Sequence, residues 1–497
     1  MADPDILIFY SPEDEPIAGQ LVHVLGELGW SVWWDKKLPA REWDVTVYSL
    51  IDRCKCAIPI WGKHSLQPGK RVINEAIAAK EASKPVFPVM VGGLKKPIDF
   101  NRHPTFDFDG WNGEKEHKGF SQLVNALAAQ LGGIPSAVKS PKRLEELRCN
   151  GAVIKLPCFV RSVSSFETQF ASPYNALKAL ELYPSNEAIL VSAYDTFLPS
   201  DANTKQKDEN VRIIAILSAL AKKGCPIFLD SGNYEAARNK ELASQAVAGK
   251  QKELWTLDKY ESALKATPFS LAFCYDEIVP SDKEEVNIQN VIESVKRHTD
   301  GRIVPIVHAP REEDGNRISD RLPALVATVS AKLRPPIIAV PERELGEGIF
   351  NRANQLFEIR KALNSLGYYQ VVHVLGTGNP ISIAILAAAG GDLFDGLEWC
   401  RTSTDRPSMT LHHHQHFDFH RIQSVEEGSC EFIREAMSDE GASHTLKMAL
   451  HNLDSYQGFI DELRFYLHKG KIGEFLALYL KKNLLEQLKA ACGEFLQ

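Results

Sequence analysis

Glu75 is a candidate catalytic carboxylate. It lies in the stretch Val-Ile-Asn-Glu-Ala at 72–76, whose spacing predicts a helix, and the apolar run at 86–90 that follows predicts a strand. A carboxylate can stabilise the positive charge that develops on a sugar carbon when a glycosidic bond breaks. A glutamate on an amphipathic helix is more often a solvated surface residue, so its surroundings decide between the two interpretations.

Further polar and aromatic side chains follow the ends of predicted strands near the N-terminus. Aromatic rings can stack on the rings of a bound nucleotide, and an arginine can pair with its pyrophosphate. The candidate binding residues are Tyr10, Ser11, Trp34, Asp35, Arg41 and Trp43. For Trp34 and its neighbour Trp33 a core role is the alternative, because one of two adjacent strand residues must face the core.

A second group of candidate residues lies in the later part of the chain. These residues are Asp230, Ser231, Tyr234, Asp276 and Asp395. Asp230 and Asp395 each follow an apolar run, and a carboxylate at the carboxyl end of a barrel strand is a frequent functional residue. The Asp-Ser-Gly-Asn sequence that starts at Asp230 also makes a good turn, so this aspartate has a structural alternative.

Length and composition indicate a globular protein of two or three domains. The chain has 497 residues, with 44% hydrophobic and 24% charged residues and a net charge of -7. That charge disfavours a broad nucleic-acid-binding surface. No apolar run approaches the roughly 20 residues of a membrane span, and the N-terminus does not resemble a signal peptide. We therefore expect a cytoplasmic protein, without membrane partners and with reduced, scattered cysteines.

The first 130 residues alternate short apolar runs with amphipathic stretches. The predicted strands are 6–10, 32–34, 57–60, 86–90 and 106–108, and the predicted helices are 17–28, 45–53, 72–82 and 120–131. This alternation predicts an α/β fold with a doubly wound parallel sheet. Ligands bind beyond the carboxyl ends of the strands in such sheets, where Tyr10, Ser11, Trp34 and Asp35 are expected to meet.

This series of segments resembles the Toll/interleukin-1 receptor (TIR) domain. The resemblance rests on a first strand ending in Tyr-Ser, a strand ending in Trp-Asp, a loop with Arg41 and Trp43, the strand 56–60, and the helix that carries Glu75. It implies a flavodoxin-like sheet and self-association through TIR domains. It also implies one of two roles, a signalling adaptor or an enzyme that cleaves the nicotinamide–ribose bond of NAD+.

In the NAD-cleaving kind, the catalytic glutamate lies in the helix after the third strand, and Glu75 matches it. NAD+ would then be the substrate, and no further cofactor is expected. Many such enzymes have Ser-x-Trp before this glutamate, whereas this chain has Gly-Lys-Arg at 69–71. Either Trp33, Trp34 or Trp61 replaces that ring, or the pocket is altered.

The sequence after residue 150 again alternates apolar runs with helical stretches. The predicted strands are 188–191, 226–229, 271–275, 303–307, 337–340, 371–375 and 393–397. Seven or more such units favour a β/α barrel of the TIM type rather than an open sheet.

Several strand ends resemble tRNA-guanine transglycosylase, a barrel enzyme that exchanges a base through a covalent ribosyl-aspartate. The similar segments are Phe-Leu-Asp-Ser-Gly-Asn-Tyr at 228–234, Phe-Cys-Tyr-Asp-Glu at 273–277, Gly-Thr-Gly-Asn-Pro at 376–380, Leu-Phe-Asp-Gly at 393–396 and His-Asn-Leu at 451–453. The resemblance implies that Asp395 is a nucleophile, Asp230 an acid or base, and Asp276 a reader of the base edge.

We expect no metal site. The Cys-x-Cys-x-x-Cys cluster that binds zinc in this family is absent, although His451 matches its histidine. The histidine-rich run at 412–416 is another candidate. Adjacent histidines on a strand point to opposite faces, however, so a closed tetrahedral set does not follow from this spacing.

The predicted domains are the TIR domain at 1–133, a turn-rich linker at 134–150 with a short helix at 142–148, the barrel at 151–420 and a C-terminal helical cap at 421–497. Alternatively, the C-terminal helices form a surface through which the protein associates with itself.

Three functions remain open at this point. The first is an NAD+ hydrolase or cyclase in bacterial antiviral defence, with the barrel sensing a nucleobase, nucleotide, nucleic acid or phage protein. The second is a base-exchange enzyme acting on nucleic acid through the barrel, with the TIR domain as a scaffold. The third is a non-enzymatic signalling adaptor.

Overall fold

The structure, a computed structural model, forms two compact units, Met1–Ser140 and Pro141–Gln497. It describes residues 3–34, 40–65, 71–94, 96–97, 100, 103–114, 117–132, 141–165, 169–197, 204–233, 255–275, 283–299, 301–311 and 317–492, with the side chains of 40–46, 204–206 and 491–492 excepted. In these ranges, no helix is both long and apolar enough to cross a bilayer.

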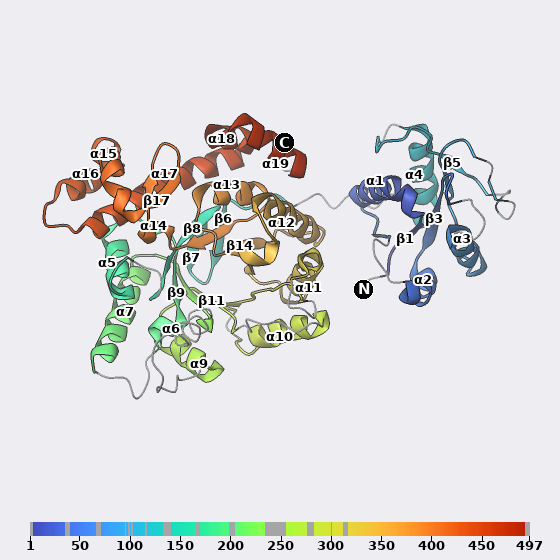
Figure 1. The fold of residues 1–497 in the computed structure, drawn as a ribbon. Helices are drawn as coiled ribbons and strands as arrows, with labels where there is room; N and C mark the ends of the chain where they lie inside the picture. The colour runs from blue at the N-terminus through green and yellow to red at the C-terminus, as the bar shows by residue number, and fades with distance from the viewer. Residues whose placement is uncertain are drawn as a thin grey trace. The chain divides into compact units, whose positions relative to one another are not determined.

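The first unit is a five-stranded parallel sheet with the order β2-β1-β3-β4-β5 and helices on both faces (Figure 1). Its strands are β1 (Ile6–Phe9), β2 (Val32–Trp33), β3 (Cys56–Trp61), β4 (Val89–Met90) and β5 (Phe106–Asp107). Its helices are η1 (Pro12–Asp14), α1 (Glu15–Glu27), α2 (Ala40–Arg53), α3 (Arg71–Glu81) and α4 (Lys118–Leu131). The predicted doubly wound, flavodoxin-like sheet is confirmed.

Alternating side chains of the interior strand β1 help to build two separate cores. Ile6 and Ile8 of β1 pack with α1 and α4 on one face of the sheet. Leu7 and Phe9 pack with α2 and α3 on the other face. Because successive strand residues point to opposite faces, a strand covered on both sides must be apolar throughout, and all four residues of β1 are buried.

The second unit is a nearly closed barrel of eight parallel strands in chain order, and the predicted β/α barrel is confirmed. The strands are β8 (Cys158–Val163), β9 (Ile189–Ser192), β10 (Ile227–Asp230), β11 (Leu271–Phe273), β12 (Ile303–Val304), β13 (Ile337–Pro341), β14 (Val371–Leu375) and β15 (Leu393–Gly396). β15 pairs with β8. The ring closes between β12 and β13, where Val307 N donates to Ala339 O and Ala339 N donates to Pro305 O, both at 2.9 Å.

The helices outside the strands are α5 (Pro173–Leu182), α6 (Ala193–Thr196), α7 (Thr204–Lys222), α9 (Leu257–Ala266), α10 (Glu284–Lys296), η3 (Ser319–Arg321), α11 (Leu322–Leu333), η4 (Glu342–Leu345), α12 (Ile349–Asn364), α13 (Pro380–Ala388) and α14 (Glu398–Arg401). β8 is the one barrel strand missing from the seven predicted. Its sequence, Cys-Phe-Val-Arg-Ser-Val, breaks the apolar pattern with Arg161 and Ser162, yet every residue of it is buried.

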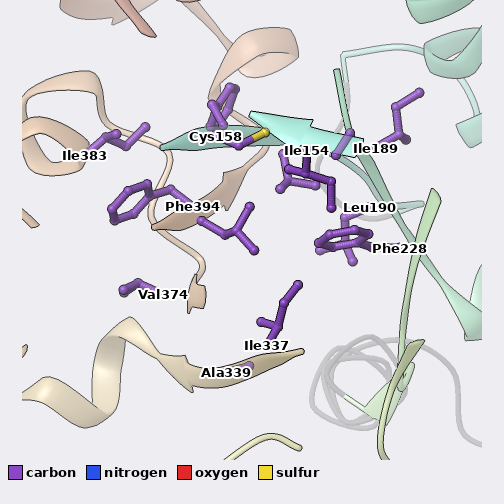
Figure 2. Packing of buried hydrophobic residues seen from close by; sticks show 14 of the residues in the cluster. Ile154, Cys158, Ile189, Leu190, Phe228, Ile337, Ala339, Val374, Ile383 and Phe394 are labelled. Atoms are coloured by element: carbon purple, nitrogen blue, oxygen red, sulfur yellow. The ribbon is translucent and has the colours of Figure 1, made fainter. Parts of the chain in front are cut away.

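The barrel interior is filled with side chains. Figure 2 shows part of the hydrophobic cluster, including Phe228 and Ile337. The His373 ring lies 6.0 Å from that of Phe228 and 5.4 Å from that of Phe273, so these three side chains face one another across the barrel. Because strand residues alternate, Asp230 and Asp395 point to this same interior side, nearer the carboxyl ends of their strands.

A buried carboxylate, Asp392, ties the opposite end of the barrel together. It is 0% exposed and precedes β15. Its oxygens accept hydrogen bonds from Arg360 Nη2 at 2.8 Å, Tyr369 OH at 2.7 Å and Val372 N at 3.0 Å. Arg143 Nη2 lies 2.9 Å from Asp392 Oδ1, which anchors the beginning of the second unit to the barrel.

The segment before the barrel is a hairpin instead of the predicted helix at 142–148. It consists of β6 (Glu146–Cys149) and β7 (Ala152–Lys155), which are antiparallel. Asn150 and Gly151 make the turn, both with positive φ. Leu147 and Ile154 of the two strands join the barrel core, so the packing of the hairpin overrides the weak helical pattern of this segment.

The C-terminal part adds a small hairpin, one 3₁₀ helix and five α-helices, which contribute to the same hydrophobic cluster. These elements are β16 (Thr402–Asp405), β17 (Thr410–His413), η5 (His414–His416), α15 (Phe417–Glu427), α16 (Glu431–Ser438), α17 (His444–His468), α18 (Ile472–Tyr479) and α19 (Lys482–Cys492). On α17, the Tyr456 ring stacks on Phe159 of β8 at 4.6 Å, and Arg464 Nη1 pairs with Glu187 Oε1 at 2.9 Å. The long helix α17 thus packs directly against the barrel.

Protein groups satisfy both ring nitrogens of His451, the histidine that matches the zinc ligand of the resembled family. Nδ1 lies 2.6 Å from Ser424 Oγ, and Nε2 lies 2.7 Å from Thr404 O. The ring is 0% exposed, and burial lowers the pKa of His451 from 6.5 to about 4. A neutral ring that donates to the carbonyl and accepts from the hydroxyl fits these partners and has no lone pair left for a metal.

We expect a chelator to leave the melting temperature unchanged, because hydrogen bonds hold His451 in place. Stability should fall as the pH drops from 6.5 toward 4, since the unfolded chain protonates this histidine and the fold does not. Thermal unfolding of wild type and His451→Gln, with and without EDTA at pH 7 and 5, measures both effects. A chelator-induced loss of stability in the wild type would contradict this assignment.

Candidate functional site

Glu75 lies on the buried face of α3, one turn after the helix begins. The buried residues of this helix are Val72, Glu75, Ala76 and Ala79, which form one face at helical spacing. Glu75 is only 9% exposed. α3 follows β3, so its first turn lies near the carboxyl edge of the sheet, where doubly wound folds bind ligands. The solvated-surface interpretation of this glutamate is therefore wrong.

Two of the candidate aromatic residues meet at the same edge. The ring of Tyr10, after β1, lies 5.7 Å from the ring of Trp34, after β2. Both are half-buried and pack against the core under α1 and α4. Trp34 also approaches Gly19 of α1, whose Cβ position would be 3.2 Å from the indole. These two rings thus lie on one face of the sheet, at the carboxyl ends of its strands. Glu75 lies on the helix that covers the other face.

The other tryptophans differ in their surroundings. Trp33 packs against the core under α2 and α3. Trp61 is fully buried and lies 5.0 Å from Phe100 in an edge-on contact. Trp61 is therefore a core residue and does not replace a ligand-stacking ring. Of the three alternatives, Trp34 and Trp33 keep partly exposed rings.

The side chains of three predicted binding residues lie outside the part of the chain that the structure describes. Asp35 lies outside the described residues, as do Gly69 and Lys70 of the departing motif. Arg41 and Trp43 belong to the first turn of α2, but their side chains are outside the description. Their proposed contacts with NAD+ stay predictions.

Ser11 supports the loop at the end of β1. It is 2% exposed, and its hydroxyl donates to Asp14 Oδ2 at 2.7 Å. Asp14 in turn lies against Gly62, at the end of β3, where an added Cβ would be 2.3 Å from Asp14 Oδ1. Gly62 N donates to Ser65 Oγ at 2.6 Å. These contacts join the loop after β1 to the loop that leads from β3 toward α3 and Glu75.

In the second unit, Asp395 is the centre of a hydrogen-bonded group at the carboxyl end of the barrel. Its Oδ2 accepts from Ser162 Oγ at 3.0 Å. Its Oδ1 accepts from Gly376 N at 3.0 Å and lies 3.0 Å from His373 Nε2. The carboxylate is 7% exposed, and His373 is 0% exposed. Three donors, one from β8 and two from β14 and the residue that follows it, therefore fix its orientation.

Asp230 and Ser231 lie at the end of β10, two strands away from β8. Asp230 Oδ2 accepts from Gly232 N at 3.1 Å, as in an Asx turn, and Ser231 O accepts from Trp255 Nε1 at 3.0 Å. The turn interpretation of this motif is thus correct, while Asp230 still faces the barrel mouth. Tyr234 and Asp276 lie outside the described residues.

Two further carboxylates extend the group around Asp395. Glu398 Oε2 is buried against Gly378 and Gly396, so close that a Cβ on either glycine would overlap it. Burial raises the pKa of Glu398, and the charges of Asp395 and Glu342 add to this effect. Burial likewise raises the pKa of Glu342, against the influence of Arg352, whose Nη1 lies 2.8 Å from Glu342 Oε1.

Several of these residues could not be recognised as site residues from the sequence. His373 lies inside the apolar run of β14, where a lone histidine is usually a core residue. Ser162 lies on the strand that periodicity missed. Glu398 is one of many glutamates, and only the two glycines that its carboxylate touches could have pointed to it. For Asp14, the acidic turn after β1 was visible, but its contact with Gly62 is a tertiary feature.

Comparison with known proteins locates one family on this chain. The model of the TIR domain family matches residues 6–124. The N-terminal unit is therefore a TIR domain. No curated protein matches the chain. The matched range begins at β1, includes Tyr10, Ser11, Trp34 and Glu75, and ends within α4.

TIR domains include signalling adaptors as well as NAD-cleaving enzymes, and the match does not separate these two kinds. In this TIR domain, the structural details that bear on the question are the burial of Glu75 and the support of the loops around it.

We expect Gly62→Ala to destabilise the TIR domain by about 1–3 kcal/mol, because the added methyl group overlaps Asp14. Asp14→Ala makes room, so the double variant should be no less stable than Asp14→Ala alone. Chemical denaturation of the two single variants and the double variant measures this coupling. Gly26→Ala, at an exposed helix position with nothing within 4 Å of the added Cβ, is the control and should not destabilise. Strictly additive effects would show that the contact is absent.

Proposed function

We propose that the TIR domain cleaves the nicotinamide–ribose bond of NAD+, with Glu75 as the catalytic carboxylate. The observation that carries this proposal is the burial of Glu75, 9% exposed, on the first turns of the helix after β3. A carboxylate withdrawn from water acts strongly on charge that develops beside it, because the surroundings screen that charge less than water would.

The chemistry follows from the bond that breaks. When the C1′–N bond of NAD+ breaks, its electron pair leaves with the nicotinamide, which becomes neutral, and positive charge remains on the ribose. The Glu75 carboxylate stabilises this charge and accepts hydrogen bonds from the ribose hydroxyls, as in glycoside hydrolysis. Because the leaving group is already cationic, no general acid is needed. Water then adds to C1′ and loses a proton, or a nitrogen of the adenine closes a ring.

Tyr10 and Trp34 are the aromatic groups proposed to stack on the substrate. Their rings are adjacent, and both are partly exposed at the sheet edge. Arg41, Trp43 and Asp35 complete the proposed set as predictions. Self-association of TIR domains is part of the proposal, since enzymatic members resemble one another in completing their site between neighbouring copies.

We further propose that the barrel controls this activity and that the protein serves in antiviral defence of a bacterium. An NAD-consuming enzyme that is always active would deplete its host, so fusion to a ligand-binding or partner-binding domain has an evident use. The barrel mouth, with its fixed carboxylates, is the proposed place for the trigger.

We expect Glu75→Ala to lower NAD+ cleavage by about 100-fold or more while TIR self-association remains. Glu81→Ala, at the exposed end of the same helix, is the matched control and should keep full activity. NAD+ and its products are measured by mass spectrometry in purified protein and in bacteria challenged with a phage panel. Loss of NAD+ in Glu75→Ala to the same extent as in wild type would show that Glu75 is not catalytic.

The barrel suggests a second function, base exchange or removal on a nucleic acid. The observation that favours it is Asp395, a carboxylate held by Ser162, His373 and Gly376 N at the carboxyl end of the barrel. In this reaction the carboxylate would attack C1′ of a nucleotide and release the base, and a second base would then displace the carboxylate.

We expect Asp395→Asn to abolish any incorporation of radiolabelled guanine into tRNA or DNA by the full-length protein, because the amide is a poor nucleophile. Asp418→Asn, at an exposed position of α15, is the control and should keep the wild-type rate. Wild-type protein that incorporates no guanine under any condition would remove this function, and the NAD+ assay would be unaffected by that result.

A further inference from the structure

Arg161 is a buried cation on the barrel strand β8, where it is only 4% exposed. Because the next residue, Ser162, points into the barrel toward Asp395, alternation along the strand places Arg161 on the outer side. Phe159 lies on that same side and stacks on Tyr456 of α17. The guanidinium group is therefore held between the barrel wall and α17, where a positive charge is costly unless an anion pairs with it.

The guanidinium group of Arg161 is only partly satisfied by the protein. Its Nη2 donates to Ser185 Oγ at 2.9 Å, and the group lies 5.7 Å from the ring of Tyr183. In the part of the chain that the structure describes, Arg161 forms no ion pair with a carboxylate, and its buried Nη1 has no hydrogen-bond partner. Two N–H donors of a buried cation are thus left without an acceptor, an arrangement that native structures rarely contain.

The acidic side chains of this region have closer partners than Arg161. Glu187, just before β9, forms a bidentate ion pair with Arg464 of α17, from Nη1 to Oε1 at 2.9 Å and from Nη2 to Oε2 at 3.1 Å. It also accepts from Cys158 Sγ at 3.3 Å. Asp461 pairs with the same arginine at 2.8 Å and is 55% exposed, so water screens its charge. The charge of Glu187 reaches Arg161 from a distance, while the carboxylate oxygens serve these other donors.

A small cavity lies beside Arg161, between β8 and α17. Phe159, Arg161 and Glu187 line it from the barrel, and Leu453, Tyr456 and Ile460 line it from α17. Its volume is about 10 Å3, which is close to the smallest space that holds one water-sized species. The cavity is therefore too small for an organic ligand or a phosphate.

We propose that Arg161 binds a small inorganic anion of the size of chloride in this cavity. The anion accepts hydrogen bonds from Nη1 and also neutralises the guanidinium group, which a water molecule does not do. It lies between a barrel strand and a helix that follows the barrel, so its binding stabilises the packing of α17 on β8.

The anion site and the carboxylate site share one strand but lie on its two sides. Arg161 faces the anion on the outer side of β8, whereas Ser162 donates to Asp395 on the inner side. An anion that holds β8 in place thus also supports the donor that orients Asp395. This binding depends neither on NAD+ cleavage by the TIR domain nor on base exchange by the barrel.

Calorimetric unfolding of the full-length protein in potassium chloride and in potassium gluconate of equal ionic strength tests the proposal. Gluconate is too large for the cavity. Chloride should raise the melting temperature of the second unit by about 2 °C or more, because an anion that binds only the folded state stabilises it. Arg161→Met should lose this difference between the two salts. In gluconate this variant should be at least as stable as the wild type, since it removes an unpaired buried charge.

Arg212→Met is the matched control. It removes an arginine from an exposed position of α7 and should keep the wild-type response to chloride. Wild-type crystals soaked in bromide should show anomalous scattering beside Arg161 Nη1, a measurement that does not depend on whether a variant folds. A water molecule at this position overturns the proposal, as do equal melting temperatures of the wild type in the two salts. A response to chloride that Arg161→Met retains overturns it as well.

Discussion

The second unit depends on a single buried carboxylate, Asp392. It lies directly before β15. Arg143 and Arg360 form ion pairs with it, and Tyr369 and the backbone of β14 donate hydrogen bonds to it. A buried ion group of this kind is costly to break, because removing one partner leaves the others charged and out of water. These contacts hold β15 at its position along the barrel axis. They therefore also position Asp395, which lies three residues further along the chain.

The two units bring polar groups to their candidate sites in different ways. In the TIR domain, Glu75 comes from a helix, and the loops beside it are supported by Ser11, Asp14 and Gly62. In the barrel, Asp395 comes from a strand and is held by donors of its neighbours. Both arrangements leave a carboxylate buried and largely withdrawn from water, where its charge acts strongly on nearby groups.

Sequence reasoning found the architecture of both units because parallel sheets covered by helices need apolar strands, and such strands stand out. β1, β3, β13 and β14 were visible as mainly apolar runs. β8 was not, because Arg161 and Ser162 lie within it, and its polar residues are satisfied only by partners far away in the sequence. The hairpin at 146–155 was missed for a related reason, since its structure depends on packing against the barrel.

Among the candidate site residues, too, some stand out in the sequence and others depend on tertiary contacts. Glu75 and Asp395 could be picked out by a family pattern, but the pattern carried no information on burial. His373 and Glu398 could not be found, because the residues that they contact, Asp395 and Gly378, lie 20 or more residues away in the sequence and meet them only in the fold. The contact between Asp14 and Gly62 belongs to the same class.

The barrel seam between β12 and β13 has a consequence for ligand binding. Among the described residues, two backbone hydrogen bonds close the ring there, and an ion pair between Arg311 and Glu344 bridges the segments that follow the same two strands. A ligand that engages these groups only when the ring is closed is thermodynamically linked to closure. Because such linkage is reciprocal, the ligand would stabilise the closed seam by the same free energy by which closure strengthens binding of the ligand.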